Sequence, residues 1–184
     1  MIMTVAELRQ FIETDEVDQV LEAKLQALEL LIRAYTNNNF QVRNFRTVVD
    51  AMATGNILAV NGTIPFKAGD TLQITESELM PDALVTVASV SDGQITVNED
   101  LYDESGVVIT KVKYPFDIKM GVVNLLKWEQ GNRDKVGIAS ESISRHSVTY
   151  FDMTGDNSTM GFPKTLMGFL LPYKKARFGR GIRA

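Results

Sequence analysis

The chain has 184 residues, of which 45% are hydrophobic and 23% charged, and its net charge is −4. This composition is typical of an ordered globular protein, because disordered chains are poorer in aliphatic and aromatic residues. Its lack of cysteine excludes disulfides, thiolate metal sites and cysteine nucleophiles, and suits a reducing compartment. No secretory signal is visible at the start, and no stretch approaches the roughly 18 apolar residues of a membrane helix. We therefore expect a chain that is made and used without crossing a membrane.

The charges are unevenly distributed along the chain. Residues 157–184 contain six basic side chains and no acidic one, so the first 156 residues carry a net charge of −10. Such a basic tail can bind a polyanion or an acidic protein surface, including that of a neighbouring copy of the same chain. Composition alone leaves both partners open.

Two helices are predicted at the start of the chain. Thr4 and Glu7 form a capping-box pattern for a first short helix, and Thr14 and Asp15 are candidate caps for a second, longer one. Residues 37–39 are three asparagines, which tolerate the left-handed conformation found just past helix ends, so they predict its stop. One broad apolar face of the second helix is expected from Val17, Val20, Leu21, Leu25, Leu28, Leu31, Ile32 and Tyr35.

The middle of the chain changes to strand patterns. From about residue 42 to residue 114, short runs rich in Val, Ile and Thr alternate with Gly, Asp, Asn and Pro. Asp92-Gly93 lies between two such runs and predicts a tight hairpin turn, because Gly readily adopts the positive backbone angles of such turns. The spacing resembles small barrels of five or six short strands.

Helical patterns return after Pro115, where Pro115 and Asp117 suit a helix start and Gly131-Asn132 suit its end. The apolar residues of this third helix cover much of its circumference, so it needs cover on two sides, from the long second helix and from a neighbouring subunit. A long polar loop follows, with a short strand at about residues 147–151. A last helix is predicted from Pro163 to Pro172.

The fold class predicted is α+β. We expect a helical bundle formed by residues 1–41 and 114–184, with a small β-barrel or β-sandwich module of residues 42–113 inserted between the second and third helices. An insertion is favoured over two domains in tandem, because neither helical part could bury its apolar face alone.

Four stretches carry a resemblance to a known family. They are TVAELRQFIETDEVDQVLEAKLQALELLIRAYTNNNF, PFDIKMGVVNLLKWEQGN, SESISRHSVTY and FPKTLMGFLLPYKKARF. Their order resembles the head-tail connector family of long-tailed bacteriophages, the adaptor or head-completion proteins that lie beneath the portal. The likeness covers about half of the chain, and the β insertion departs from the family's smaller members.

The resemblance implies a non-enzymatic structural protein of the virion neck, without a cofactor, that is assembled in the cytoplasm of the bacterial host. It implies a closed homo-oligomeric ring, a dodecamer, with C-terminal segments that reach the portal protein. The opposite surface would receive a tail-completion or stopper protein. DNA would pass through the lumen during packaging and ejection without sequence-specific contacts.

The C-terminal arm is the candidate site for binding the portal or a neighbouring subunit. Its apolar part would anchor by burial and its basic part would guide docking, and the twelve residues after Pro172 could span about 40 Å when extended. The candidate arm residues are Phe162, Leu166, Leu170, Pro172, Tyr173, Lys174, Lys175, Arg177, Phe178, Arg180 and Arg183. The candidate subunit interface on the third helix consists of Val122, Leu125, Leu126 and Trp128.

Two other classes of function remain open. The first is a nucleic-acid-binding module that uses the small barrel together with the basic tail, although few basic residues lie in the barrel region and its aromatic residues Phe66 and Tyr102 make a poor stacking platform. The second is a hydrolase or metal site at the carboxylates Glu99, Asp100, Asp103 and Glu104, whose spacing matches no calcium loop. His146 is the only histidine, and we expect it to be a solvated loop residue.

Overall fold

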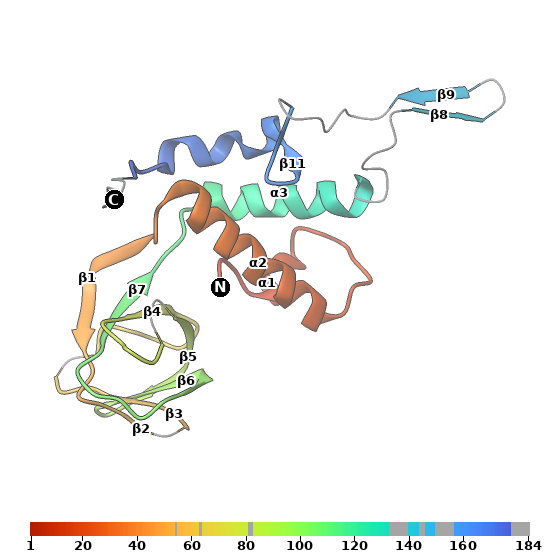
Figure 1. The fold of residues 1–184 in the computed structure, drawn as a ribbon. Coiled ribbons are helices and arrows are strands. Elements are labelled where there is room, and N and C mark those ends of the chain that lie inside the picture. The colour runs from red at the N-terminus through yellow and green to blue at the C-terminus, as the bar shows by residue number, and fades with distance from the viewer. Residues whose placement is uncertain are drawn as a thin grey trace. The chain divides into compact units, whose positions relative to one another are not determined.

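The computed structural model describes residues 1–53, 55–62, 64–80, 83–132, 140–143, 146–149 and 157–177 (Figure 1), of which 51–53, 140–143 and 146–149 are described by their backbone alone. The chain forms two compact units. One consists of Met1 and Asn39–Tyr114 and is called the β unit here. The other consists of Ile2–Asn38 and Pro115–Ala184 and is called the helical unit.

The β unit is a seven-stranded antiparallel sheet with the order β1-β7-β4-β5-β6-β3-β2. Three of its pairings, β2-β3, β4-β5 and β5-β6, join consecutive strands, and the other three, β1-β7, β4-β7 and β3-β6, join strands farther apart in sequence. The predicted turn at Asp92-Gly93 is confirmed, because Ser91 pairs with Gln94 and Gly93 has a φ of +72°. The strands are β1 Gln41–Val48, β2 Ala51–Ala53, β3 Gly55–Ala59, β4 Thr71–Thr75, β5 Leu84–Ser91, β6 Gln94–Leu101 and β7 Val108–Val112.

The two end strands of this sheet, β1 and β2, are joined by Val49 and Asp50 alone. The Val49 amide donates to the Val107 carbonyl at 2.8 Å, and the Asp50 amide donates to the Ala59 carbonyl at 2.9 Å. The sheet thus curls until its ends follow each other in the chain. The two end strands do not pair, however, so the closed barrel that we expected is not found in the described part of the chain.

The core of the β unit is aliphatic and lies on the inner face of the curled sheet. Alternation of buried and exposed residues along β6 places Ile95 and Val97 inside, as the period-2 pattern predicts. The other buried residues of this core are Val49, Leu58, Val60, Phe66, Leu72, Ile74, Val85, Val87, Leu101, Val107 and Ile109.

The helical unit contains two long helices, α2 Asp18–Thr36 and α3 Phe116–Asn132, and the single-turn helix α1 Val5–Leu8. The last predicted helix is a 3-10 helix, η2 Lys164–Tyr173, rather than an α-helix. Gly168 and Pro172 disfavour a regular α-helix in this segment. Two short antiparallel pairs complete the unit, β8 Ser140–Ile143 with β9 His146–Thr149, and β10 Ser158–Thr159 with β11 Phe162–Pro163.

The predicted helical bundle is not confirmed in its simple form. The buried face of α2 includes Leu21, Leu25, Leu28 and Ile32, and η2 lies along α3 (Figure 1). At Gly121 of α3 a Cβ atom would overlap the ring of Phe169 of η2, so the two helices approach closely at this point. The helical unit therefore rests on α2, α3 and a 3-10 segment that packs tightly on α3.

The ends of α2 follow the sequence only in part. Asn37 adopts the predicted left-handed conformation with a φ of 51°, so the predicted stop is confirmed. The predicted caps Thr14 and Asp15 are wrong, because α2 begins after Val17, which provides no side-chain cap. At α1 the predicted cap forms, with the Glu7 amide donating to Thr4 Oγ1 at 3.1 Å.

Candidate assembly surfaces of the helical unit

The C-terminal arm lies against the C-terminal end of α2. The Lys175 amide donates to the Thr36 carbonyl at 2.8 Å, and the Arg177 guanidinium donates to the Ala34 carbonyl at 2.6 Å. Asn37 Nδ2 donates to the Ala176 carbonyl at 3.0 Å. Carbonyls at the end of a helix lack partners within the helix and carry partial negative charge. The basic arm therefore caps α2 from a distant part of the sequence.

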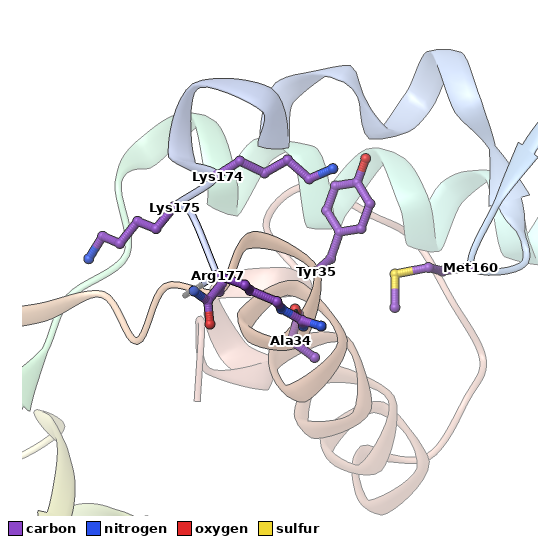
Figure 2. A pocket seen from close by; sticks show the side chains of 7 residues that line it. Ala34, Tyr35, Met160, Lys174, Lys175 and Arg177 are labelled. Carbon is purple, nitrogen blue, oxygen red and sulfur yellow. Dashed lines mark hydrogen bonds between the residues drawn. The ribbon is translucent and has the colours of Figure 1, made fainter. Parts of the chain in front are cut away.

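This capping leaves a basic pocket on the surface, shown in Figure 2. The pocket has a volume of about 460 Å³. Lys174 Nζ lies 4.1 Å from the centre of the Tyr35 ring, a cation–π contact that orients the arm. The basic pocket is lined by Ala34, Tyr35, Asn37, Met160, Lys174, Lys175 and Arg177.

Tyr173 ties the arm to the start of α3. Its hydroxyl donates to both carboxylate oxygens of Asp117, at 2.8 and 2.7 Å. This hydrogen bond to Asp117 raises the pKa of Tyr173 above its usual value, because the bond favours the neutral phenol. A second tie is the bond from Asn38 Nδ2 to the Tyr173 carbonyl at 3.3 Å.

The predicted arm residues that the structure describes are buried, half-buried or exposed. Phe162 and Leu170 are buried in the helical unit, and Leu166 and Tyr173 are half-buried. Exposed side chains are those of Pro172, Lys174, Lys175 and Arg177, whereas Phe178, Arg180 and Arg183 lie outside the described residues. The stretch from Tyr173 to Arg177 is held on α2, so the free extended chain that we expected does not begin at Pro172. Binding of the portal by this arm stays a prediction.

The predicted subunit interface on α3 is covered by the same chain. Val122, Leu125 and Leu126 are at most 2% exposed, and the half-buried Trp128 meets the Phe162 ring edge-on with a centroid distance of 5.7 Å. The second cover that we assigned to a neighbouring subunit is provided by η2 and the segment before it. Sequence pattern showed that α3 needs two covers but not which segments supply them.

An apolar stripe on α2 is the surface that the sequence analysis missed. Val20 is 43% exposed, although the sequence analysis placed it on the broad apolar face, and Leu30, which was not placed on that face, is 63% exposed. The α2 stripe consists of Val20, Ala23, Ala27, Leu30 and Ala34, all exposed. Their spacing of three and four residues is that of a helix-packing seam, on the side opposite the buried face. The sequence contains this spacing of three and four residues, but the buried face has larger apolar residues and therefore gives the stronger pattern.

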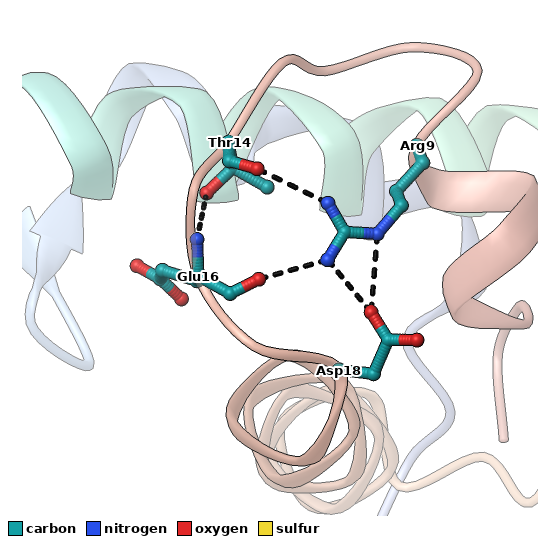
Figure 3. Close-up of polar contacts among 4 residues, drawn as sticks. All are labelled: Arg9, Thr14, Glu16 and Asp18. Carbon is teal, nitrogen blue, oxygen red and sulfur yellow. Dashed lines mark hydrogen bonds and ion pairs between the residues drawn. The ribbon is translucent and has the colours of Figure 1, made fainter.

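The segment before α2 is an ordered acidic loop, residues 13–17, which leads into Asp18, the first residue of α2 (Figure 3). The Arg9 guanidinium donates to Asp18 Oδ1 at 2.6 and 3.1 Å, to the Thr14 carbonyl at 3.1 Å and to the Glu16 carbonyl at 2.8 Å. The Glu16 amide donates to Thr14 Oγ1 at 3.2 Å. Arg9 thus fixes the loop in an extended shape, which explains why Thr14 cannot cap α2.

Two of the carboxylates of the predicted acidic turn have structural partners in the β unit. Glu99 accepts a hydrogen bond from the Thr86 amide at 2.8 Å. Glu104 accepts one from the Ser77 hydroxyl at 2.6 Å and one from the Glu78 amide at 2.9 Å, and these bonds, Ser77 first, lower the pKa of Glu104. Asp100 and Asp103 are exposed. Glu99 and Asp100 lie in β6, so only Asp103 and Glu104 belong to a charged connection after that strand.

His146 is the first residue of β9 and pairs with Ile143, whereas the sequence analysis placed it in a loop. Within the described ranges no three His, Asp or Glu side chains are grouped so that they could hold a metal ion. Nor does any described helix combine the length and apolarity needed to cross a bilayer.

Strand β1 has an exposed basic and aromatic surface. Phe45 is 39% exposed, Arg43 and Arg46 are exposed, and Lys111 Nζ lies 5.6 Å from the centre of the Phe45 ring. Phe66, one of the two aromatic residues considered for stacking, is buried at 6% exposure. Tyr102, the other residue considered, is 62% exposed, and Phe45 is a further exposed aromatic residue of this unit that the sequence analysis overlooked.

Comparison with known proteins gives loose similarities. No family model and no curated protein matches the chain. The neck of an empty GTA particle, computed with C6 symmetry, aligns over 98% of this chain and 93% of its own, with 12% identity and a TM-score of 0.34. A tailspike protein of Pseudomonas phage LKA1 aligns over 36% of this chain with 22% identity and a TM-score of 0.31.

A third solved structure, the tailspike of Acinetobacter baumannii bacteriophage AP22 in complex with a capsular saccharide, aligns over 40% of this chain with 19% identity and a TM-score of 0.29. The alignments span 14% and 15% of the two tailspike chains. The TM-scores, from 0.29 to 0.34, are too low to indicate a shared fold.

Proposed function

We propose that this chain is a structural protein of a bacteriophage virion, a head-tail adaptor whose copies form a ring beneath the portal. In this role the ring joins capsid to tail and leaves a channel through which DNA passes. The order of helical segments that resembles the connector family supports the proposal. The observation that carries it is the α2 stripe, an exposed apolar seam on a helix whose opposite face is already buried.

The α2 stripe favours self-association for a physical reason. Burial of apolar surface stabilises a contact by about 25 cal/mol per Å², so a seam with Leu30 and Val20 exposed is more stable when another surface covers it. Small residues at Ala23, Ala27 and Ala34 would let a neighbouring backbone approach closely. A subunit that assembles through such a seam needs no catalytic group.

The test is the substitution Leu30→Glu, with Gln26→Glu as its matched control. Both add one negative charge to an exposed position of α2, but only Leu30 lies in the stripe. We measure mass by light scattering for the chain by itself and for the chain mixed with the portal protein of the same phage. In both samples we expect the Leu30→Glu chain to be a monomer, whereas the Gln26→Glu chain should assemble as the wild type does. Circular dichroism should show equal helix content in both variants.

Two outcomes would contradict the adaptor proposal. One is a wild-type chain that stays monomeric both alone and with the portal. The other is a phage whose particles join capsid to tail and infect when this chain is deleted.

The nucleic-acid-binding alternative is favoured by one specific observation, the exposed Phe45 between Arg43 and Arg46 on β1. An exposed ring among cations can stack a base while the cations contact phosphates. Binding of single-stranded DNA that weakens with salt and is lost in Phe45→Ala would support this alternative.

A further inference from the structure

We propose that the basic pocket of one copy receives the acidic loop of a second copy, so that subunits join head to tail through the two ends of α2. This inference rests on the proposed function, because it adds to the α2 stripe a second contact through which the ring subunits would meet. Four observations of the helical unit lead to it: the charges of the two surfaces, the match of their apolar parts, their ordered structure, and their positions.

The charges of the two surfaces are complementary. In the basic pocket the exposed cations are Lys174, Lys175 and Arg177. In the acidic loop Glu13 and Asp15 are exposed, and neither has an ion pair or hydrogen bond among the described residues. Opposite potentials on two surfaces steer their encounter and fix their register.

The apolar parts of the two surfaces also match. Val17 of the acidic loop is 64% exposed, flanked by acidic residues. Beside its cations the basic pocket offers Ala34, the half-buried Tyr35 ring and Met160, which is 46% exposed. A valine side chain can fill such a pocket while its acidic neighbours reach the rim.

Both surfaces are ordered before any contact forms. Arg9 holds the acidic loop with four hydrogen bonds, and the arm that carries the pocket's cations is bonded to the carbonyls of Ala34 and Thr36. Preorganised surfaces lose less conformational entropy on association. A merely solvated charged loop and tail would not need this ordering.

The positions of the two surfaces exclude a contact within one copy. The acidic loop ends where α2 begins, and the basic pocket lies at the C-terminal end of α2. With 19 residues and a rise of about 1.5 Å per residue, the helix separates them by about 28 Å. A contact between them must therefore join different copies, and contacts between unlike surfaces generate rings when the rotation closes.

The test uses cysteine trapping, which is clean because the natural chain has no cysteine. In the double variant Asp15→Cys with Lys175→Cys, an intramolecular disulfide cannot bridge the two ends of α2, because bridged Cα atoms lie within about 7 Å of each other. Mild oxidation should produce a ladder of disulfide-linked oligomers on a non-reducing gel. Peptide mass spectrometry should identify the link between residues 15 and 175.

Controls separate the proposed contact from random collision. Asp15→Cys paired with Lys127→Cys, an exposed position of α3 outside the pocket, should give no ladder above that of the single variants. Adding Lys174→Glu to the trapping pair should reduce the yield several-fold, and adding Glu13→Lys as well should restore it in part. High salt should lower the yield, since exposed charges are screened.

A trapping pair that gives no more ladder than its control overturns this inference. If Leu30→Glu still abolishes assembly in that case, the proposed function survives and another surface joins the subunits. If the pair gives no ladder and duplex DNA protects the thiol of the Lys175→Cys variant from alkylation, the basic pocket is a phosphate-binding surface instead.

Discussion

At the scale of single residues, close packing between α3 and η2 depends on Gly121. The missing side chain at this position leaves room for the Phe169 ring, which a Cβ atom would overlap. Gly in a helix interior costs stability relative to Ala in the absence of such a contact, so its presence here is explained by packing.

The substitution Gly121→Ala should destabilise the helical unit by about 1–3 kcal/mol, because overpacking forces the ring or the helix to shift. Gly131→Ala is the control, since nothing lies within 4 Å of a Cβ atom at that position of the same helix. It should leave stability unchanged or raise it. Urea unfolding followed by helical circular dichroism measures both, and equal midpoints for the two variants would argue against the close approach.

Arg9 is the residue with the most consequence for the proposed assembly. It has four hydrogen bonds to the acidic loop and Asp18, and its ion pair with Asp18 is exposed on both sides. Exposed ion pairs stabilise a fold little, by about 0–1 kcal/mol. We therefore interpret Arg9 as a residue that fixes the shape of the loop rather than one that stabilises the fold.

At the scale of elements, the C-terminal end of α2 is completed by chain about 140 positions away in the sequence. The arm donates hydrogen bonds to the carbonyls of Ala34 and Thr36, which the helix leaves open, and its own carbonyls accept from the side-chain amides of Asn37 and Asn38. The basic composition of the arm is explained in part by this position, since cations are favourable at a helix C-terminus.

Truncation after Pro172 should lower the free energy of unfolding of the helical unit by about 1–3 kcal/mol, because it removes these bonds. Truncation after Arg177 keeps all of them and should leave the unfolding midpoint unchanged. Denaturant unfolding of the two truncated chains provides the measurement. A midpoint that is unchanged in both would mean that the arm is not held on α2.

The sequence predicted turns and helix ends better than it predicted which distant segments contact them. The Asp92-Gly93 turn, the stop at Asn37 and the start of α3 depend on backbone preferences of a few neighbouring residues, and all three are found. The start of α2 was wrong because Arg9, several residues away, holds Thr14. The cover of α3 was wrong because pattern shows that a face is apolar, not which segment lies on it.

At the scale of the whole molecule, the β unit begins and ends at neighbouring positions. The Lys113 amide donates to the Phe40 carbonyl at 3.0 Å, and the rings of Phe40 and Tyr114 lie 4.9 Å apart. The core of the β unit consists of its own residues only, from Val49 to Ile109. The β unit therefore has the properties of a separable insertion.

Replacing residues 41–113 by a short Gly-Ser linker should leave a helical unit that folds. We expect the shortened chain to keep its helical circular dichroism signal and to assemble to the same number of subunits by light scattering, because the α2 stripe is unchanged. The same shortened chain with Leu30→Glu is the control and should be monomeric. Loss of helix content in the shortened chain alone would contradict this prediction.

The discontinuity of the helical unit also orders events on the ribosome. Residues 2–38 emerge first, and α1 can pack on α2, but the rest of the helical unit, including η2, begins at Pro115, after the whole β unit. At translation rates of about 5–20 residues per second, synthesis of the β unit takes on the order of 4–15 s. During this time Leu21, Leu25 and Ile32 of α2 lack the cover of the later segments. The β unit, in contrast, is nearly continuous in sequence and can complete its sheet during that interval. The β unit of a nascent chain should therefore fold first. The subunit can assemble only after the ribosome has released the last residues of the helical unit.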